Sequence, residues 1–202
     1  MGVDAVKGPD VLSAMLPSIV MRVLAALLVF APLVRAQSTS VASTTVILVR
    51  HAEKAAEPAA DPPLTADGAA RAVALVALVR DAGVSAIIST RFQRTLQTAA
   101  PAAAALRVPV EIVEARAPNH ARMVADSLLV RHRGQTVLVV GHSNTVPAIV
   151  AALGAPQPAE ICDPDYDNVY VVTVPATGAA SVVRMHFGAP AGGNVSCAAM
   201  KR

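Results

Sequence analysis

The chain has 202 residues, of which 54% are hydrophobic, and its formal net charge is +3. This length suits one α/β domain with a sizeable core, and the apolar content excludes a disordered chain. The charge is small, and no cluster of Lys and Arg is interleaved with aromatic residues, which argues against a nucleic-acid partner.

The first part of the chain, residues 1–36, is predicted to be a targeting segment. It has the parts of a signal peptide: Met21 is followed by one basic residue, the apolar stretch Val23–Val34 and the small Ala36, after which we expect cleavage. Met21 is a candidate for the true start, and a start at Met1 would give an unusually long leader. An uncleaved membrane anchor is the alternative, although this apolar stretch is short for a bilayer crossing. We therefore expect an exported protein, periplasmic or secreted, whose mature domain covers residues 37–202. It would touch a membrane only through an uncleaved segment.

After this segment, strand and helix patterns alternate along the chain. In chain order we expect strands at Val46–Val49, Ala86–Ser89, Val110–Val113 and Thr136–Val140, helices at about 65–81, 91–106, 119–133 and 144–153, and a C-terminal hairpin of Asn168–Val174 and Ser181–Phe187. This βαβαβαβ order predicts a largely parallel sheet with helices on both faces. The predicted fold is a single three-layer α/β/α sandwich with a C-terminal hairpin.

Histidines follow two of the predicted strands. Arg50-His51 follows the first strand, and His142 follows the fourth. Arg94 is in the first turn of the helix after the second strand. In parallel sheets the loops beyond the C-terminal strand ends converge, so these side chains should share one site. Arginines, histidines and helix N-termini all favour an anion, which predicts a site for a phosphoryl group.

The three junctions that carry these residues have extended motifs. In chain order they read Val49-Arg50-His51-Ala52-Glu53-Lys54, Ser89-Thr90-Arg91-Phe92-Gln93-Arg94-Thr95-Leu96-Gln97-Thr98-Ala99 and Gly141-His142-Ser143-Asn144-Thr145. Together and in this order, they resemble the histidine phosphatase superfamily, which includes the cofactor-dependent phosphoglycerate mutases and the histidine acid phosphatases. The resemblance extends over nearly all of the predicted mature domain.

The resemblance implies a phosphoric monoester hydrolase of a phosphoglycerate mutase-like, small exported bacterial type. His51 would be the nucleophile that takes the phosphoryl group, and Arg50, Arg94 and His142 would clamp its oxygens. These cationic donors would replace the metal ions of other phosphatases, so we expect no metal and no other cofactor. Asn144 is a further substrate-binding candidate, although the preferred interpretation is that Asn144 or Thr145 caps the helix after His142.

The acid that protonates the leaving oxygen is left open by the motifs. In the mutase-like branch it is a glutamate between the second arginine and the second histidine, which corresponds to Glu114. In the acid phosphatase branch it is an aspartate directly after the second histidine, where this chain has Ser143. Glu53, Glu57 and Asp61, in the loop after the first motif, are competing candidates.

Other activities compete with that of a phosphatase. One is phosphoglycerate mutase-type phosphotransfer, although the short segment between Arg94 and His142 leaves little room for the cap that mutases carry. Another is a catalytically silent protein that binds phosphorylated ligands. Metal coordination by His51, Glu53 and His142 is disfavoured because Arg50 and Arg94 would repel a cation. The expected partner is a small phosphorylated substrate or a phosphoprotein, and neither its identity nor the oligomeric state follows from the sequence.

Two cysteines, Cys162 and Cys197, lie in the C-terminal part of the chain. In an exported protein a disulfide between them is permitted, and it would tie the tail to the loop before Asn168. Two unpaired thiols are the alternative. The spacing does not fit a zinc site.

Overall fold

The computed structural model describes residues 1–2 and 42–191 of the chain. The chain divides into two compact units, Met1–Thr39 and Ser40–Arg202, and every element described below belongs to the second unit. The predicted targeting segment, apart from its first two residues, lies outside the described residues, as does Cys197. Within the described ranges, no helix is both long and apolar enough to cross a membrane.

Six strands form one sheet in the order β3-β2-β4-β1-β5-β6. Four of them are mutually parallel, namely β1 (Thr44–Arg50), β2 (Val84–Ser89), β3 (Val110–Ile112) and β4 (Thr136–Gly141). The antiparallel β5 (Asn168–Val174) pairs with β1 and, in the predicted hairpin, with β6 (Ser181–His186). The predicted α/β sandwich with a largely parallel sheet and a C-terminal hairpin is confirmed.

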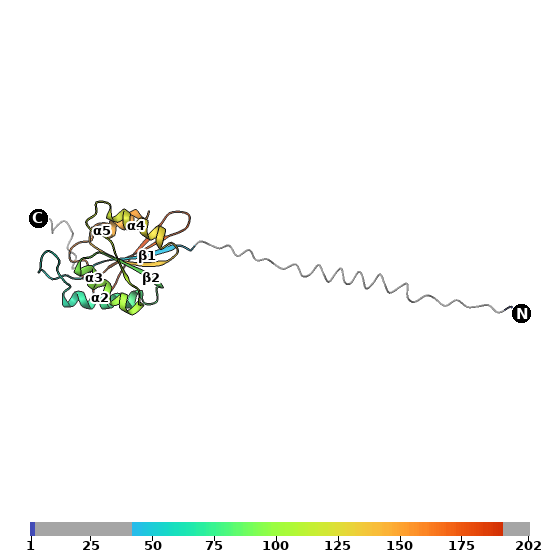
Figure 1. Cartoon of the computed structure of the whole chain (residues 1–202), viewed down its shortest axis with the longest axis horizontal. Helices are drawn as coiled ribbons and strands as arrows, with labels where there is room; N and C mark the ends of the chain where they lie inside the picture. Colours follow the sequence, from blue (N-terminus) through green and yellow to red (C-terminus); the bar gives the residue numbers. More distant parts are fainter. Residues whose placement is uncertain (3–41, 192–202) are drawn as a thin grey trace. The chain divides into compact units, whose positions relative to one another are not determined.

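Helices cover both faces of this sheet, with α2 and α3 on one side and α4 and α5 on the other (Figure 1). Their bounds are Ala66–Val79 for α2, Gln93–Leu106 for α3, His120–Arg131 for α4 and Thr145–Ala152 for α5. The helices lie where the sequence predicts them, with ends that shift by one or two residues. Thr65 caps α2, since its side chain accepts a hydrogen bond of 3.1 Å from the Gly68 amide.

The strand β1 shows why the apolar run is continuous instead of alternating. Val46 and Leu48 pack into the cluster under α4 and α5, whereas Ile47 and Val49 pack into the cluster under α2 and α3. A strand buried on both faces must be apolar at every position. This run therefore holds Arg50 rigidly at the C-terminal edge of the sheet.

Candidate active site

The C-terminal ends of three neighbouring strands define the site. In the parallel register Arg50 of β1 lies opposite Gly141 of β4, and Ser89 of β2 lies opposite Val140. The residues that follow these ends therefore meet, and the ring centroids of His51 and His142 are 5.5 Å apart. The structure thus brings together the two histidines that the motifs predict.

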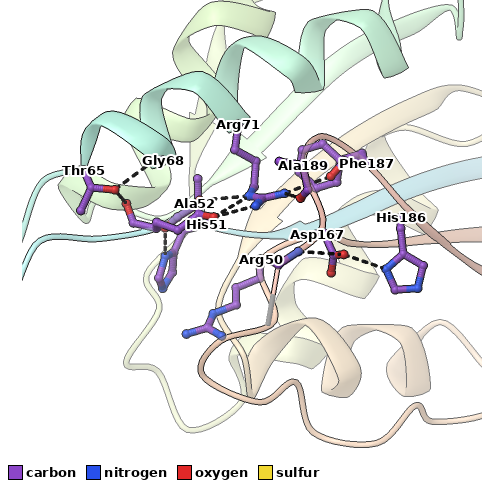
Figure 2. A network of polar contacts seen from close by, with 12 residues as sticks. Arg50, His51, Ala52, Thr65, Gly68, Arg71, Asp167, His186, Phe187 and Ala189 are labelled. Atoms are coloured by element: carbon purple, nitrogen blue, oxygen red, sulfur yellow. Dashed lines mark hydrogen bonds and ion pairs between the residues drawn. The ribbon is translucent and has the colours of Figure 1, made fainter. Parts of the chain in front are cut away.

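The His51 ring is buried and held in one orientation. Its Nδ1 lies 2.8 Å from the carbonyl oxygen of Ala52, a contact that is visible in Figure 2. Because a carbonyl can only accept, Nδ1 carries the proton and the lone pair is on Nε2. Burial lowers the pKa of His51 to about 3, with a further lowering by Arg50, His142 and Arg94, while the Ala52 contact opposes the shift. The imidazole is therefore neutral near pH 7, as a nucleophile must be.

Arg50 is held by the loop that follows α5. Its Nη1 donates to the carbonyl oxygens of Cys162 (2.7 Å) and Asp163 (3.0 Å), and its Nη2 donates to the Asp163 carboxylate (2.8 Å). The Tyr166 ring stacks on the guanidinium at 4.2 Å and lies 6.0 Å from the His51 ring. Arg50 Nε is buried and, among the described residues, has no hydrogen-bond partner.

Arg94 is placed by the first turn of α3. Its guanidinium lies 4.4 Å from the Phe92 ring, and its Nη1 is 3.7 Å from the Asp61 carboxylate. Burial lowers the pKa of Arg94, and the nearby charges of Arg50 and Arg116 lower it further, whereas Asp61 opposes the shift. Its Nε is also buried without a partner in the part of the chain that the structure describes. Two such donors beside two histidines suit an anion, because buried N–H groups otherwise find acceptors.

His142 is fixed by hydroxyl and backbone contacts. Its Nε2 is joined to Thr90 Oγ1 by a hydrogen bond of 3.1 Å, and its backbone amide donates to Thr145 Oγ1 at 2.9 Å. Burial lowers the pKa of His142 to about 4, with further lowering by Arg94, His120 and Arg50. The ring is therefore neutral before a phosphate arrives, and a bound dianion would favour its protonated form.

The predicted acid Glu114 lies at the rim and has partners of its own. Its carboxylate forms an ion pair of 2.8 Å with Arg91 and accepts a hydrogen bond of 3.0 Å from the Arg116 amide. The Glu114 side chain is 41% exposed. To protonate a leaving oxygen it would have to leave Arg91, and its role as the acid stays a prediction.

The three other candidates for the acid, Glu53, Glu57 and Asp61, also form hydrogen bonds or ion pairs with other residues. Glu53 binds Arg71 through both carboxylate oxygens, with the shortest contact at 2.6 Å. Glu57 accepts the Ala59 amide at 2.9 Å. Asp61 accepts the Gln93 amide at 2.9 Å and also lies 3.7 Å from Arg94, one of the predicted clamp residues.

Asn144 and the cysteines complete the predicted residues. Asn144 is exposed at the N-cap of α5 and forms no side-chain capping bond, so the interpretation that Asn144 caps this helix is wrong. The Thr145 hydroxyl instead accepts the His142 amide, one turn earlier in the chain. A substrate-binding role of Asn144 stays a prediction. Cys162 is disulfide-bonded, while Cys197, its predicted partner, lies outside the described residues.

Several residues that surround the site are not identified as part of it by any pattern in the sequence. Tyr166 and Asp163 follow α5 in an irregular loop that sequence patterns describe only as polar, and they reach Arg50 across more than a hundred residues of chain. Thr90 lies inside the second motif, so its position there is the signal that could have identified it. Within residues 42–191, no group of three or more His, Cys, Asp or Glu side chains is arranged to hold a metal ion.

Comparison with known proteins agrees with the motifs. The family model "Histidine phosphatase superfamily (branch 1)" matches residues 46–117, a range that includes Arg50, His51, Arg94 and Glu114. No curated protein matches the chain.

Solved structures share the fold. The protein histidine phosphatase SixA, in a complex with tungstate, is similar with a TM-score of 0.58 and 21% identity over 70% of this chain and 96% of its own. YhfR of Bacillus stearothermophilus gives a TM-score of 0.54 and 21% identity over 76% and 98%. A mycobacterial glucosyl-3-phosphoglycerate phosphatase gives 0.53 and 13% over 65% and 90%. The family model over residues 46–117 and the three ordered motifs thus make the chain similar to the histidine phosphatase superfamily, and the solved structures share its fold.

Proposed function

We propose that this chain hydrolyses phosphoric monoesters through a covalent phosphohistidine at His51. One observation carries the proposal: a buried His51 with its proton on Nδ1 lies among arginines whose Nε donors have no protein partner in the described residues. Phosphoryl transfer to a histidine requires a neutral imidazole as the nucleophile and hydrogen-bond donors that can bind the phosphoryl oxygens.

The proposed reaction has two steps. Nε2 of His51 attacks phosphorus, so that a P–N bond forms while the ester P–O bond breaks and the leaving oxygen takes a proton. Water then attacks phosphorus, the P–N bond breaks and orthophosphate leaves. Arg50, Arg94 and a protonated His142 stabilise the equatorial oxygens in both steps, which is the contribution that metal ions make elsewhere. The proposed enzyme is therefore metal-independent.

The test uses an aryl phosphate in the presence of EDTA. We expect turnover by the wild type and trapping of acid-labile phosphate on His51. His51→Ala should lose at least about a thousandfold in kcat, as expected when a nucleophile is removed. His186→Ala is the matched control, since its ring is exposed and is bonded to Asp167 outside the clamp. Equal rates for wild type and His51→Ala would refute the proposal.

The group that protonates the leaving oxygen can be identified by comparing esters whose leaving groups differ in their need for a proton. If Glu114 protonates the leaving oxygen, Glu114→Gln should slow hydrolysis of alkyl phosphates much more than that of aryl phosphates, because an aryl oxide leaves without a proton. An equal effect on both esters would exclude Glu114. The same series with Asp61→Asn examines the carboxylate beside Arg94.

Hydrolysis of protein phosphohistidine is a second candidate. Glu53, Glu114 and Asp61 each have an arginine or a backbone amide as a partner, and an imidazole leaves far more readily than an alkoxide. SixA, one of the similar structures, is a protein histidine phosphatase. A kcat/KM for a phosphohistidine peptide that exceeds that for alkyl phosphates by about a hundredfold would favour this substrate.

Two other outcomes would point elsewhere. Isomerisation of a phosphoglycerate without release of orthophosphate would indicate mutase-type phosphotransfer. Tight binding of orthophosphate without turnover of any ester would indicate a silent phospho-ligand binding protein.

We also propose export of the mature domain. This proposal is supported by the basic, apolar and small-residue pattern around Val23–Val34. N-terminal sequencing of the processed protein should start at Gln37. Retention of Met1 or Met21 on a membrane-bound form would support the anchor alternative.

A further inference from the structure

Thr98 is a buried hydroxyl that the proposed mechanism does not use. It lies on α3 one turn after Arg94, and its residue is 0% exposed. Thr98 Oγ1 accepts a hydrogen bond of 2.9 Å from the Ala52 amide and donates one of 2.6 Å to the carbonyl oxygen of Arg94. Both directions are unambiguous, because an amide N–H only donates and a carbonyl only accepts.

This hydroxyl reaches the nucleophile through one residue. Ala52, which is also 0% exposed, donates its amide to Thr98 and accepts the Nδ1 proton of His51 with its carbonyl at 2.8 Å. The carbonyl of Ala52 can fix the His51 tautomer only if the Ala52 backbone itself is fixed. Thr98 supplies that restraint from α3.

The neighbouring helix α2 and its N-cap restrain the next residue, Glu53. Glu53 accepts the Thr65 amide at 2.9 Å with its carbonyl, and a Cβ added at Gly68 would lie 2.2 Å from the same oxygen. Arg71 holds the Glu53 carboxylate, and Figure 2 shows Arg71, Gly68 and Thr65 around the segment that starts at His51. The segment after the nucleophile is therefore held between α2 and α3.

We propose that Thr98 is a positioning residue, which holds the backbone of Ala52 through its amide so that the Ala52 carbonyl keeps the His51 proton on Nδ1 and the lone pair on Nε2. Because the same hydroxyl bonds the Arg94 carbonyl, it also sets the spacing between the nucleophile and the helix that carries a clamp arginine. The inference rests on the proposed function for its kinetic part. Its tautomer part can be measured without turnover.

The test compares Thr98→Val, Thr98→Ser and Thr44→Val in the full mature chain. Valine keeps the shape of threonine and removes both hydrogen bonds, whereas serine keeps the hydroxyl. Thr44 is the matched control, since it is buried and its Oγ1 accepts the Gly134 amide at 2.9 Å at the opposite end of β1. All rates are normalised to the folded fraction.

For Thr98→Val we expect kcat for an aryl phosphate to fall about 10- to 100-fold, because small displacements of a reacting group have effects of this size. The inhibition constant of orthophosphate should change less than about threefold, since the clamp side chains remain. Thr98→Ser should recover most of kcat, and Thr44→Val should lose stability without losing kcat. The nitrogen NMR shifts of His51 should show the Nδ1–H tautomer in wild type and a tautomer mixture in Thr98→Val.

An unchanged kcat and an unchanged tautomer in Thr98→Val would overturn the inference, as would an equal fall of kcat in Thr44→Val. Should Thr98→Val not fold, Thr98→Ala takes its place with the same expected and overturning results. Failure of the proposed function is distinguishable, because the wild type would then lack turnover while the tautomer comparison would still decide the role of Thr98.

Discussion

Acidification should destabilise this protein through the two histidines of its site. In the folded chain the pKa of His51 is lowered to about 3 and that of His142 to about 4, mainly by burial, from an ordinary value of 6.5. Between these values and pH 6.5 the unfolded chain binds protons that the folded chain does not bind. The free energy of unfolding therefore falls as the pH falls through this window, and it rises with pH.

The size of the effect follows from the two shifts. Each pH unit in which only the unfolded state holds the proton is worth about 1.4 kcal/mol. From the unperturbed value down to about pH 4.5, each histidine therefore removes roughly 2–3 kcal/mol, and the pair removes roughly 5 kcal/mol. Since whole domains are stable by about 5–15 kcal/mol, this loss would bring the protein close to unfolding.

The assay is urea unfolding at about pH 7.5 and about pH 4.5, without phosphate, for wild type and His51→Gln. Carboxylates titrate in both proteins, so their effect cancels in the comparison. His51→Gln should lose roughly 3 kcal/mol less than wild type on acidification. His186→Gln is the control, because its side chain is 58% exposed, and it should behave like wild type.

If the free energy of unfolding falls equally in wild type and in His51→Gln on acidification, the reasoning that burial keeps His51 neutral is refuted. Added orthophosphate should make the acid-induced losses of the two proteins more similar, because a bound anion favours the protonated imidazoles.

Three further predictions concern the residues around the nucleophile. Gly68→Ala would stabilise an ordinary helix by about 1 kcal/mol, but here its Cβ would lie 2.2 Å from the Glu53 carbonyl oxygen, so thermal unfolding should show a lower Tm; a higher Tm would contradict the close approach. Arg71→Leu leaves the Glu53 carboxylate without its partner and two backbone carbonyls without their donor, and urea unfolding should show a loss of about 3–5 kcal/mol; a loss below about 1 kcal/mol would mean that the pair is solvated. Asp163→Asn removes the carboxylate that competes for Arg50, so inhibition by orthophosphate should tighten by about three- to tenfold; weaker inhibition would show that Asp163 positions Arg50 more than it competes for it.

The local pattern of the chain was sufficient to predict the sheet and to place His51 at its edge. β1 is buried on both faces, which requires a continuous apolar run, and the residue after such a run must emerge at the sheet edge. The parallel order then brings the ends of β1, β2 and β4 together, so Arg50, His51 and His142 could be assigned to one site. The hydrophobic pattern of a strand and the order of the elements along the chain can both be read directly from the sequence.

The capping prediction for Asn144 shows where local reasoning fails. An asparagine before a helix is a good cap by composition, yet the side chain forms no capping bond, and the Thr145 hydroxyl accepts the His142 amide instead. The course of the backbone after β4 determines which of these two side chains finds a backbone amide within reach. The capping propensity of a residue type carries no information on that course.

Strand burial and motif order in the sequence indicated the layered fold and the residues that reach one edge of the sheet, and the family resemblance suggested the roles proposed for them. How these groups are held depends on the tertiary structure. The loop after α5 binds Arg50 through Asp163 and Tyr166, and Thr98 supports the backbone next to His51. These contacts join residues that are far apart along the chain, and their partners depend on side-chain packing that no periodic pattern records.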